Sequence, residues 1–250
     1  MLLISTSSFH GYGIHRIFTI VKKSGYDGIN LDMISGEFDT EDAAYIKELS
    51  LEFSIPVVSI TAYEKKMDSK LVDETIKFAK TVGAKIINFY PPHRADKDTT
   101  WFSTYLPKVK EKTKDISLSI INVEPKTFLF FIPEYKDATL TTINKITGDT
   151  SLAISNVDSS TGVDLLKTFT ILNKTIKNVF LSDKSGTKQD LQLGKGEMPL
   201  ESFLIKLREG NYKGLFTLRL SPKELGVGNE GIILKKMEEA KVYFEKYFVS

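Results

Sequence analysis

Short apolar runs rich in β-branched residues recur eight times along this chain, and amphipathic helical patterns lie between them. Most of the runs lack strict alternation of apolar and polar residues, which favours parallel strands that are buried on both faces. The runs cover Leu2–Ser5, Gly28–Leu31, Pro56–Thr61, Lys85–Tyr90, Ile116–Val123, Ser151–Val157, Lys177–Ser182 and Gly214–Leu220. Eight strand–helix units in 250 residues predict an α/β fold, a single (β/α)8 TIM barrel domain over residues 1–250. A doubly wound open sheet of the same length is the alternative.

The helical patterns support this alternation. From Ile233 to Tyr247, apolar residues follow one another at steps of four and three, which predicts a helix with one buried face. Gly25 and Gly83 each stand just before a predicted strand, where a left-handed residue typically ends the preceding helix. The fifth helix is expected near Thr139–Ile146.

The composition argues against several classes of function. A net charge of +2 gives no general attraction to nucleic acids or anionic membranes, so neither is expected as a partner. The absence of cysteine excludes disulfides and thiolate chemistry, which fits the reducing cytoplasm. The segment Met1–Gly13 lacks the basic and apolar regions of a signal peptide. No apolar run approaches the roughly 18 residues of a membrane span, so we expect a cytoplasmic protein.

The barrel prediction also selects candidates for a functional site. In such barrels the loops at the carboxyl ends of the strands build the active face. The polar residues that follow the predicted strands are Ser7, Ser8, His10, Asp32, Tyr63, Tyr90, His93, Asn122, Glu124, Asn156, Asp158, Asp183, Lys184 and Arg219. Such residues also cap helices and satisfy loop backbone groups, so position alone does not separate the two roles.

Several segments together resemble the xylose-isomerase-like family of sugar phosphate isomerases and epimerases, to which endonuclease IV is related. The segments are GYDGINL (Gly25–Leu31), VGAKIINFYPP (Val82–Pro92), LSIINVEP (Leu118–Pro125), LAISNVDSSTGVD (Leu152–Asp164) and the stretch Ile176–Pro222. The resemblance implies a TIM barrel that usually holds one divalent metal. In that family the metal is typically bound by a glutamate, an aspartate, a histidine and a second glutamate from the last four strands.

Carried over by position, the four ligands fall on Ile121, Ser155, Phe180 and Arg219. Isoleucine and phenylalanine offer no lone pair to a hard cation, and a guanidinium repels one. The resemblance therefore implies that the family's metal site is lost, and we expect neither a metal nor another cofactor.

A displaced cation site is the alternative to complete loss. Glu124, Asp158 and Asp183 stand three residues beyond the first three ligand positions. Three residues along a strand reverse the face and add about 10 Å, so these carboxylates would lie in loops above the family's site. They include no histidine, which makes the set a poor match to the family's ligands.

Two kinds of function remain open. In the first, the barrel mouth binds a small sugar, sugar phosphate or other anionic metabolite without metal-dependent catalysis. The ligand-binding candidates are Tyr90, Asn122, Asp183, Lys184 and Arg219. In the second, a metal-independent isomerase or epimerase uses proton carriers and stabilises an enolate with Arg219 or Lys184. The candidate proton carriers are His10, His93, Glu124 and Asp158. A DNA-repair enzyme like endonuclease IV is a less favoured alternative than either, because such an enzyme needs a metal cluster and a basic DNA-binding face.

Arg219 is the most informative of the replacements. A guanidinium buried at a strand end is costly unless an anion pairs with it. The anion is either internal, with Asp158, Asp183 or Glu124 as candidates, or a ligand carboxylate or phosphate held by the guanidinium fork. The aromatic segment Phe128–Lys136 is interpreted as a lid, as a contact in a possible homodimer, or as packing on the fifth helix.

Overall fold

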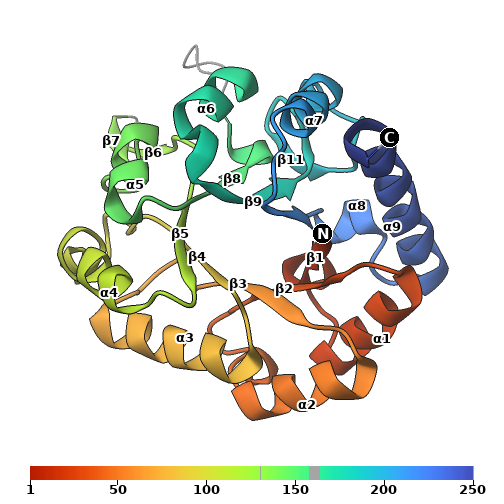
Figure 1. The fold of residues 1–250 in the computed structure, drawn as a ribbon, viewed down its shortest axis with the longest axis horizontal. Coiled ribbons are helices and arrows are strands. Elements are labelled where there is room, and N and C mark those ends of the chain that lie inside the picture. The colour runs from red at the N-terminus through yellow and green to blue at the C-terminus, as the bar shows by residue number, and fades with distance from the viewer. Residues whose placement is uncertain (130, 158–163, 250) are drawn as a thin grey trace.

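The computed structural model describes residues 1–129, 131–157 and 164–249, so Asp158 lies outside the described residues. Within these ranges eight strands close a barrel in the order β1-β2-β3-β4-β5-β8-β9-β12 (Figure 1). The strands are β1 (Leu2–Ser5), β2 (Gly28–Asp32), β3 (Val57–Thr61), β4 (Ile86–Phe89), β5 (Ser117–Ile121), β8 (Thr150–Ala153), β9 (Ile176–Leu181) and β12 (Leu215–Leu218). All neighbouring pairs are parallel. The predicted (β/α)8 barrel is confirmed, and the open sheet is excluded.

Helices surround the barrel on the outside (Figure 1). They are α1 (Ile14–Ser24), α2 (Ala43–Phe53), α3 (Ser69–Val82), α4 (Leu106–Lys112), α5 (Leu140–Thr147), α6 (Leu165–Leu172), α7 (Leu200–Glu209), α8 (Pro222–Leu225) and α9 (Glu230–Phe244). Gly25 and Gly83 end α1 and α3 with φ values of 69° and 87°, which confirms both predicted C-caps. The fifth helix begins one residue later than predicted, because Thr139 is its N-cap and its hydroxyl accepts the Thr142 amide.

The interior of the barrel is polar at mid-height, while the large apolar core lies between the strands and the helices. Side chains alternate along β2, so Asn30 faces inward and Leu31 faces the helices. Asn30 Oδ1 accepts a hydrogen bond of 2.8 Å from Ser59, and Asn88 Oδ1 accepts one of 2.6 Å from Ser151. All of these side chains are fully buried. Side-chain hydrogen bonds between neighbouring strands therefore satisfy the buried polar groups that fill the barrel interior.

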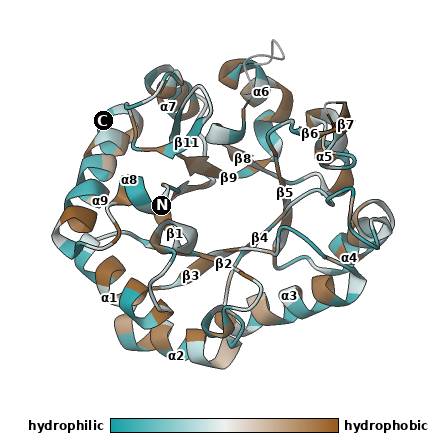
Figure 2. Cartoon of the chain, turned by 180° about the vertical axis from the view of Figure 1, so that it is seen from behind, coloured by the Kyte–Doolittle hydropathy of each residue, from teal (hydrophilic) through white to brown (hydrophobic). Residues whose placement is uncertain are grey.

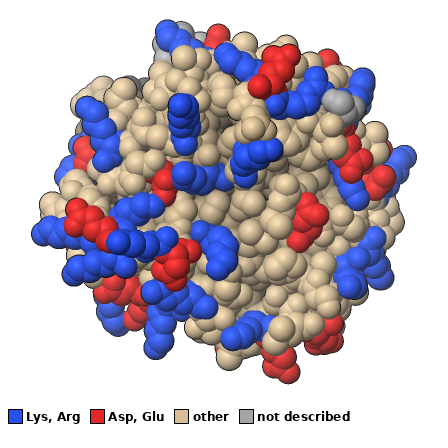
Figure 3. All heavy atoms as spheres, in the orientation of Figure 1, with Lys and Arg blue, Asp and Glu red and all other residues tan. Residues whose placement is uncertain are grey.

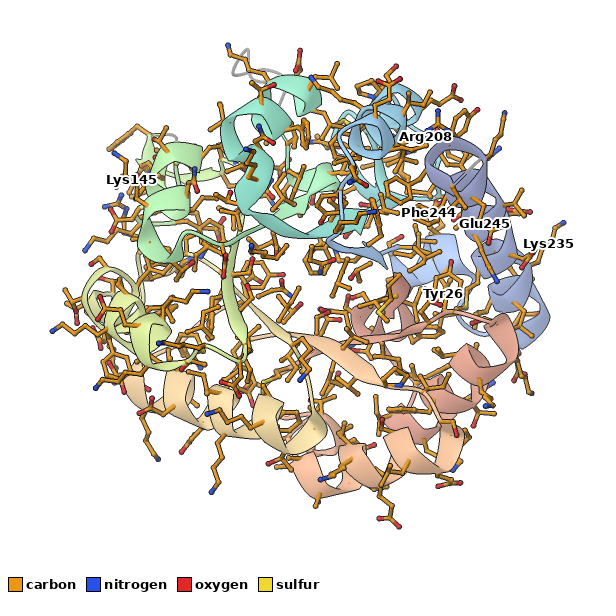
Figure 4. All side chains as sticks on the ribbon, viewed as in Figure 1. Tyr26, Lys145, Arg208, Lys235, Phe244 and Glu245 are labelled. Atoms are coloured by element: carbon orange, nitrogen blue, oxygen red, sulfur yellow. The ribbon has the colours of Figure 1, made fainter. Side chains whose placement is uncertain are left out.

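The first and last long helices of the chain, α1 and α9, pack side by side. Tyr26, labelled in Figure 4, follows the end of α1 and donates its hydroxyl to the Met237 carbonyl on α9 at 3.0 Å. Burial raises the pKa of this phenol, so Tyr26 stays neutral. Figure 2 shows hydrophobic and hydrophilic residues on the same helices, as amphipathic packing on a barrel requires.

Surface charge and helix length show how the protein compares with what binding to a nucleic acid or spanning a membrane would require. On the face shown in Figure 3, basic and acidic side chains are interspersed, and no uniformly basic surface is visible there. Across the described ranges, each helix is too short or too polar to cross a bilayer.

Candidate functional site

Two adjoining cavities open at the carboxyl ends of the strands, which we call the barrel mouth. The main cavity has a volume of about 1010 Å³ and extends over the ends of β1 to β4 toward α3. Its lining includes Ser7, Asp32, Glu41, Thr61, Tyr63, Glu64, Lys65, Lys66, Glu74, Phe78, Tyr90 and Arg219. The side cavity, of about 300 Å³, is lined by Glu124, Lys126, Tyr135, Asn156, Gln189 and Asp190 among others. Ser7, Glu64, Tyr90 and Arg219 line both cavities and therefore stand at their junction.

Arg219 follows β12 and is 9% exposed. Its Nε donates to Asp190 Oδ1 at 3.4 Å, and its Nη2 donates to Ser155 Oγ at 3.3 Å. The guanidinium carbon lies 5.1 Å from the centroid of the Phe180 ring. Burial lowers the pKa of Arg219, but the charges of Asp190 and Asp32 outweigh burial and raise it, so the side chain stays charged.

Among the described residues, Arg219 pairs with an internal carboxylate, Asp190, and with neither Glu124 nor Asp183; the third predicted candidate, Asp158, lies outside those residues. Asp190 also accepts hydrogen bonds from Ser155 at 2.7 Å and Ser182 at 3.1 Å. It lies on β11 (Lys188–Leu191), which pairs with β10 (Asp183–Ser185) in a hairpin after β9. The prediction considered only residues at the ends of barrel strands. It missed Asp190 because a hairpin outside the barrel places this residue at the mouth.

Asp32 is the second buried ionisable group that lines the main cavity, at 8% exposure. Its Oδ2 accepts four hydrogen bonds, from Ser5 Oγ at 2.5 Å, the Ser7 amide at 3.1 Å, Asn30 Nδ2 at 3.2 Å and Thr6 Oγ1 at 3.3 Å. Burial raises the pKa of Asp32, and the hydrogen bonds and the charge of Arg219 only partly oppose this effect. Asp32 was among the strand-end residues in the sequence but was not selected, because no pattern distinguished it from a capping residue.

The wall of the mouth beside Arg219 is apolar. Ile121, Ala153 and Phe180 are fully buried and form a small separate cluster, against which Tyr90 packs. Burial raises the pKa of Tyr90 to about 12, so its hydroxyl is protonated.

The four positions that the family resemblance assigns to metal ligands meet at this wall. Ile121 and Phe180 are part of the apolar cluster, while Arg219 and Ser155 are hydrogen-bonded to each other. As a set, the four side chains present one hydroxyl oxygen to a cation. In the described part of the chain, no three His, Asp or Glu side chains are close enough together to hold a metal.

Glu124 and Lys184 form an ion pair at the edge of the side cavity. Lys184 Nζ lies 2.9 Å from Glu124 Oε1, and Lys126 Nζ lies 3.2 Å from Oε2. Burial raises the pKa of Glu124, but the hydrogen bonds and charges of the two lysines outweigh it and hold the pKa below its usual range. Both groups are thus engaged with each other rather than directed at the main cavity.

Two further ligand-binding candidates hold the backbone of the barrel and its loops. Asn122 donates to the Ala153 carbonyl at 3.0 Å and accepts the Ala153 amide at 2.6 Å, so its amide group clamps β8. Asp183, which is 1% exposed, accepts the amides of Gly196 at 2.9 Å and Met198 at 3.1 Å. Neither residue lines the main or the side cavity. In the described part of the chain, Asp183 and Glu124 belong to no cluster of three possible metal ligands, and Asp158 lies outside that part, so the displaced cation site finds no geometric support there.

The two histidine candidates lie outside both cavities. His10 is exposed, and its Nδ1 lies 3.3 Å from Glu37 at a different surface depression. His93 accepts the Ala95 amide on Nδ1 at 3.2 Å, so its Nε2 carries the proton that faces Glu134 at 3.0 Å. Both ring nitrogens of His93 are therefore occupied by contacts within the protein.

The aromatic segment Phe128–Lys136 overlaps the pair of short antiparallel strands β6 (Thr127–Phe128) and β7 (Ile132–Pro133). Tyr135 pairs with His93 in an isolated bridge and donates its hydroxyl to Glu64. The segment therefore joins the loop after β5 to the loops after β3 and β4. This placement is consistent with the lid interpretation, since Tyr135 lines the side cavity.

Solved structures with the same fold include several sugar epimerases. L-ribulose 3-epimerase is 13% identical, with a TM-score of 0.74 and coverage of 99% of this chain and 94% of that chain. The IOLI protein, solved with a zinc atom bound, is 15% identical, with a TM-score of 0.72 and coverage of 100% and 99%. The 3-keto-D-glucoside 4-epimerase YcjR from E. coli is 14% identical, with a TM-score of 0.69 and coverage of 98% of both chains. No protein-family model and no curated protein matches the sequence. The chain has the xylose-isomerase-like (β/α)8 barrel fold of these proteins.

Proposed function

We propose that the main cavity binds a small neutral sugar with the protein's own side chains and without a divalent metal. The observation that carries this proposal is the meeting of Asp32, Tyr90 and Arg219 in one large cavity at the carboxyl face of the barrel. Ligand sites in this fold lie at that face. The sugar epimerases that share the fold support a sugar as the ligand class.

The charge of the lining favours a neutral ligand over a phosphate or carboxylate. The main cavity is lined by four carboxylates, Asp32, Glu41, Glu64 and Glu74, and by three cations, Lys65, Lys66 and Arg219. The charge of Arg219 is already paired with Asp190. An incoming anion would therefore meet no excess of positive charge. Aromatic side chains such as Tyr63 and Phe78 supply apolar contact for the ring carbons of a sugar.

The residues at the family's metal positions do not fit a divalent cation. Hard cations need several oxygen or nitrogen ligands, whereas Ile121 and Phe180 supply none. Arg219 places a positive charge beside the same wall. We therefore derive no step through a metal at this mouth.

Proton transfer by the sequence candidates finds less support than binding. His10 lies outside the cavities, and the ring nitrogens of His93 are both engaged. Glu124 is held as a carboxylate by two lysines. The metal-independent isomerase would therefore need proton carriers other than these three.

Filling the junction of the two cavities is expected to abolish sugar binding. Ser7 lines both cavities, so the indole of Ser7→Trp would occupy the space in front of Arg219. Calorimetric titration with neutral hexoses and pentoses should give heat of binding with the wild-type protein and none with Ser7→Trp. Lys22→Trp places the same indole on the exposed end of α1 and should bind as the wild type does. Equal affinity of the wild type and Ser7→Trp would show that the sugar does not bind in this cavity. Absence of sugar binding by the wild type would overturn the proposed function.

A further inference from the structure

The hydrogen bonds of Asp32 are distributed unequally between its two oxygens. All four donors reach Oδ2. Among the residues that the structure describes, no donor reaches Oδ1. This oxygen is not one of the fully buried polar atoms without a hydrogen-bond partner, so it is open to solvent. Because Asp32 is 8% exposed and lines the main cavity, the open oxygen faces that cavity. The donors on Oδ2 fix the orientation of the carboxylate, so Oδ1 is a rigid acceptor.

Arg219 has a matching open donor. Its Nε and Nη2 are engaged with Asp190 and Ser155, whereas Nη1 contacts no acceptor within the described ranges. Like Asp32 Oδ1, Nη1 is not one of the fully buried polar atoms without a hydrogen-bond partner, so it is open to solvent. Both side chains line the main cavity, and Ser7 links them: its amide donates to Asp32 Oδ2 at 3.1 Å, and it stands with Arg219 at the junction of the two cavities. One rigid acceptor and one rigid donor therefore line the same cavity.

We infer that Asp32 and Arg219 form a specificity device that accepts a sugar hydroxyl and rejects an oxyanion at the inner end of the main cavity. This inference rests on the proposed sugar-binding function and adds the residues that set its selectivity. A hydroxyl both accepts and donates, so one hydroxyl satisfies Arg219 Nη1 and Asp32 Oδ1 together. When Asp32 is ionised, a carboxylate or phosphate that accepts from Arg219 turns lone pairs toward Oδ1, which leaves two negative groups in contact. Tyr90 lines the same cavity, and we expect its hydroxyl to offer a third polar contact.

Replacing Asp32 with asparagine should reverse this selectivity. The amide of Asp32→Asn would keep the shape of the side chain, remove its charge and turn a donor toward the ligand if its oxygen still accepts the four inner hydrogen bonds. Each neutral hexose that binds the wild-type protein is titrated beside its own uronic acid. We expect Asp32→Asn to lose about 10- to 100-fold in affinity for the neutral sugar, as is typical when a hydrogen bond to a charged group is lost. We expect the same variant to bind the uronic acid more tightly than the wild type does, because an amide would replace the acidic group that repels the carboxylate of the uronic acid.

Asp39→Asn is the matched control. Asp39 is exposed in the connection that follows Asp32, between β2 and α2, and does not line the main cavity. Its substitution also replaces an aspartate with asparagine. It should leave both affinities unchanged. If Asp32→Asn leaves the preference for the neutral sugar as it is in the wild type, the specificity device is wrong while the sugar site stands. If no neutral sugar binds the wild type, the proposed function fails, and the device fails with it.

A crystal structure of the wild-type protein with the bound sugar tests the same inference without relying on a variant that folds. One sugar hydroxyl should lie within hydrogen-bond distance of both Asp32 Oδ1 and Arg219 Nη1. A sugar that occupies the main cavity without contacting Asp32 would overturn the inference.

Discussion

Phe180→Ala is expected to lower the free energy of unfolding by about 3–5 kcal/mol, as is usual for a fully buried aromatic residue. Phe180 is 0% exposed and packs against Ile121 and Ala153 inside the barrel. Its ring also lies beneath the Arg219 guanidinium, so the substitution removes both apolar packing and a cation–π contact. The strands around the ring are hydrogen-bonded on both sides and cannot collapse to fill the space. Urea denaturation followed by far-UV circular dichroism measures the change.

Phe131→Ala is the control for this loss. Phe131 is 77% exposed, so its removal should change the free energy of unfolding by less than about 0.5 kcal/mol. If Phe180→Ala costs no more than Phe131→Ala, the apolar wall of the mouth does not exist as described.

Arg219→Met should also destabilise the protein, by about 1–3 kcal/mol, because it removes the buried member of a partly buried ion pair while keeping similar volume. Asp190 would retain its hydrogen bonds from Ser155 and Ser182 but lose its counter-ion. Asp32 would lose the same neighbouring cation, which raises its pKa further. Denaturant unfolding of the purified variant measures the loss.

A double-mutant cycle separates the ion pair from general packing. Asp190→Asn alone should be destabilising, since it leaves the guanidinium without this carboxylate. The double variant Arg219→Met/Asp190→Asn should lose less stability than the sum of the two single variants, because neither charge is then left unpaired. Strictly additive losses would show that the 3.4 Å contact contributes no coupling.

The fold followed from the sequence because burial on both faces of parallel strands leaves a strong local pattern. Gly28–Leu31 and Lys177–Ser182 were placed within one residue of β2 and β9 at each end. The largest error in the strands is at Ser151–Val157. There the strand ends at Ala153, and Ile154–Asn156 forms a 3-10 helix instead. Apolar content alone does not distinguish a buried strand from the buried turn that follows it.

The site was only partly predictable. The rule that strand ends build the mouth located Tyr90, Glu124 and Arg219, which line the cavities. It failed for Asp190, whose place depends on a hairpin outside the barrel. It also could not distinguish Asp183, which holds a loop, from Asp32, which faces the cavity. The difference lies in tertiary hydrogen bonds, and those leave no periodic signal in the sequence.

The central claim is that the mouth binds a neutral sugar with its own side chains and without a metal. The most direct test combines metal analysis of the purified protein with calorimetric titration of the sugar, in EDTA and again in excess Mn²⁺. We expect far less than one bound transition metal or magnesium ion per chain and the same dissociation constant under both conditions. A stoichiometric ion at the mouth, together with sugar binding that disappears in EDTA and returns with Mn²⁺, would contradict the claim.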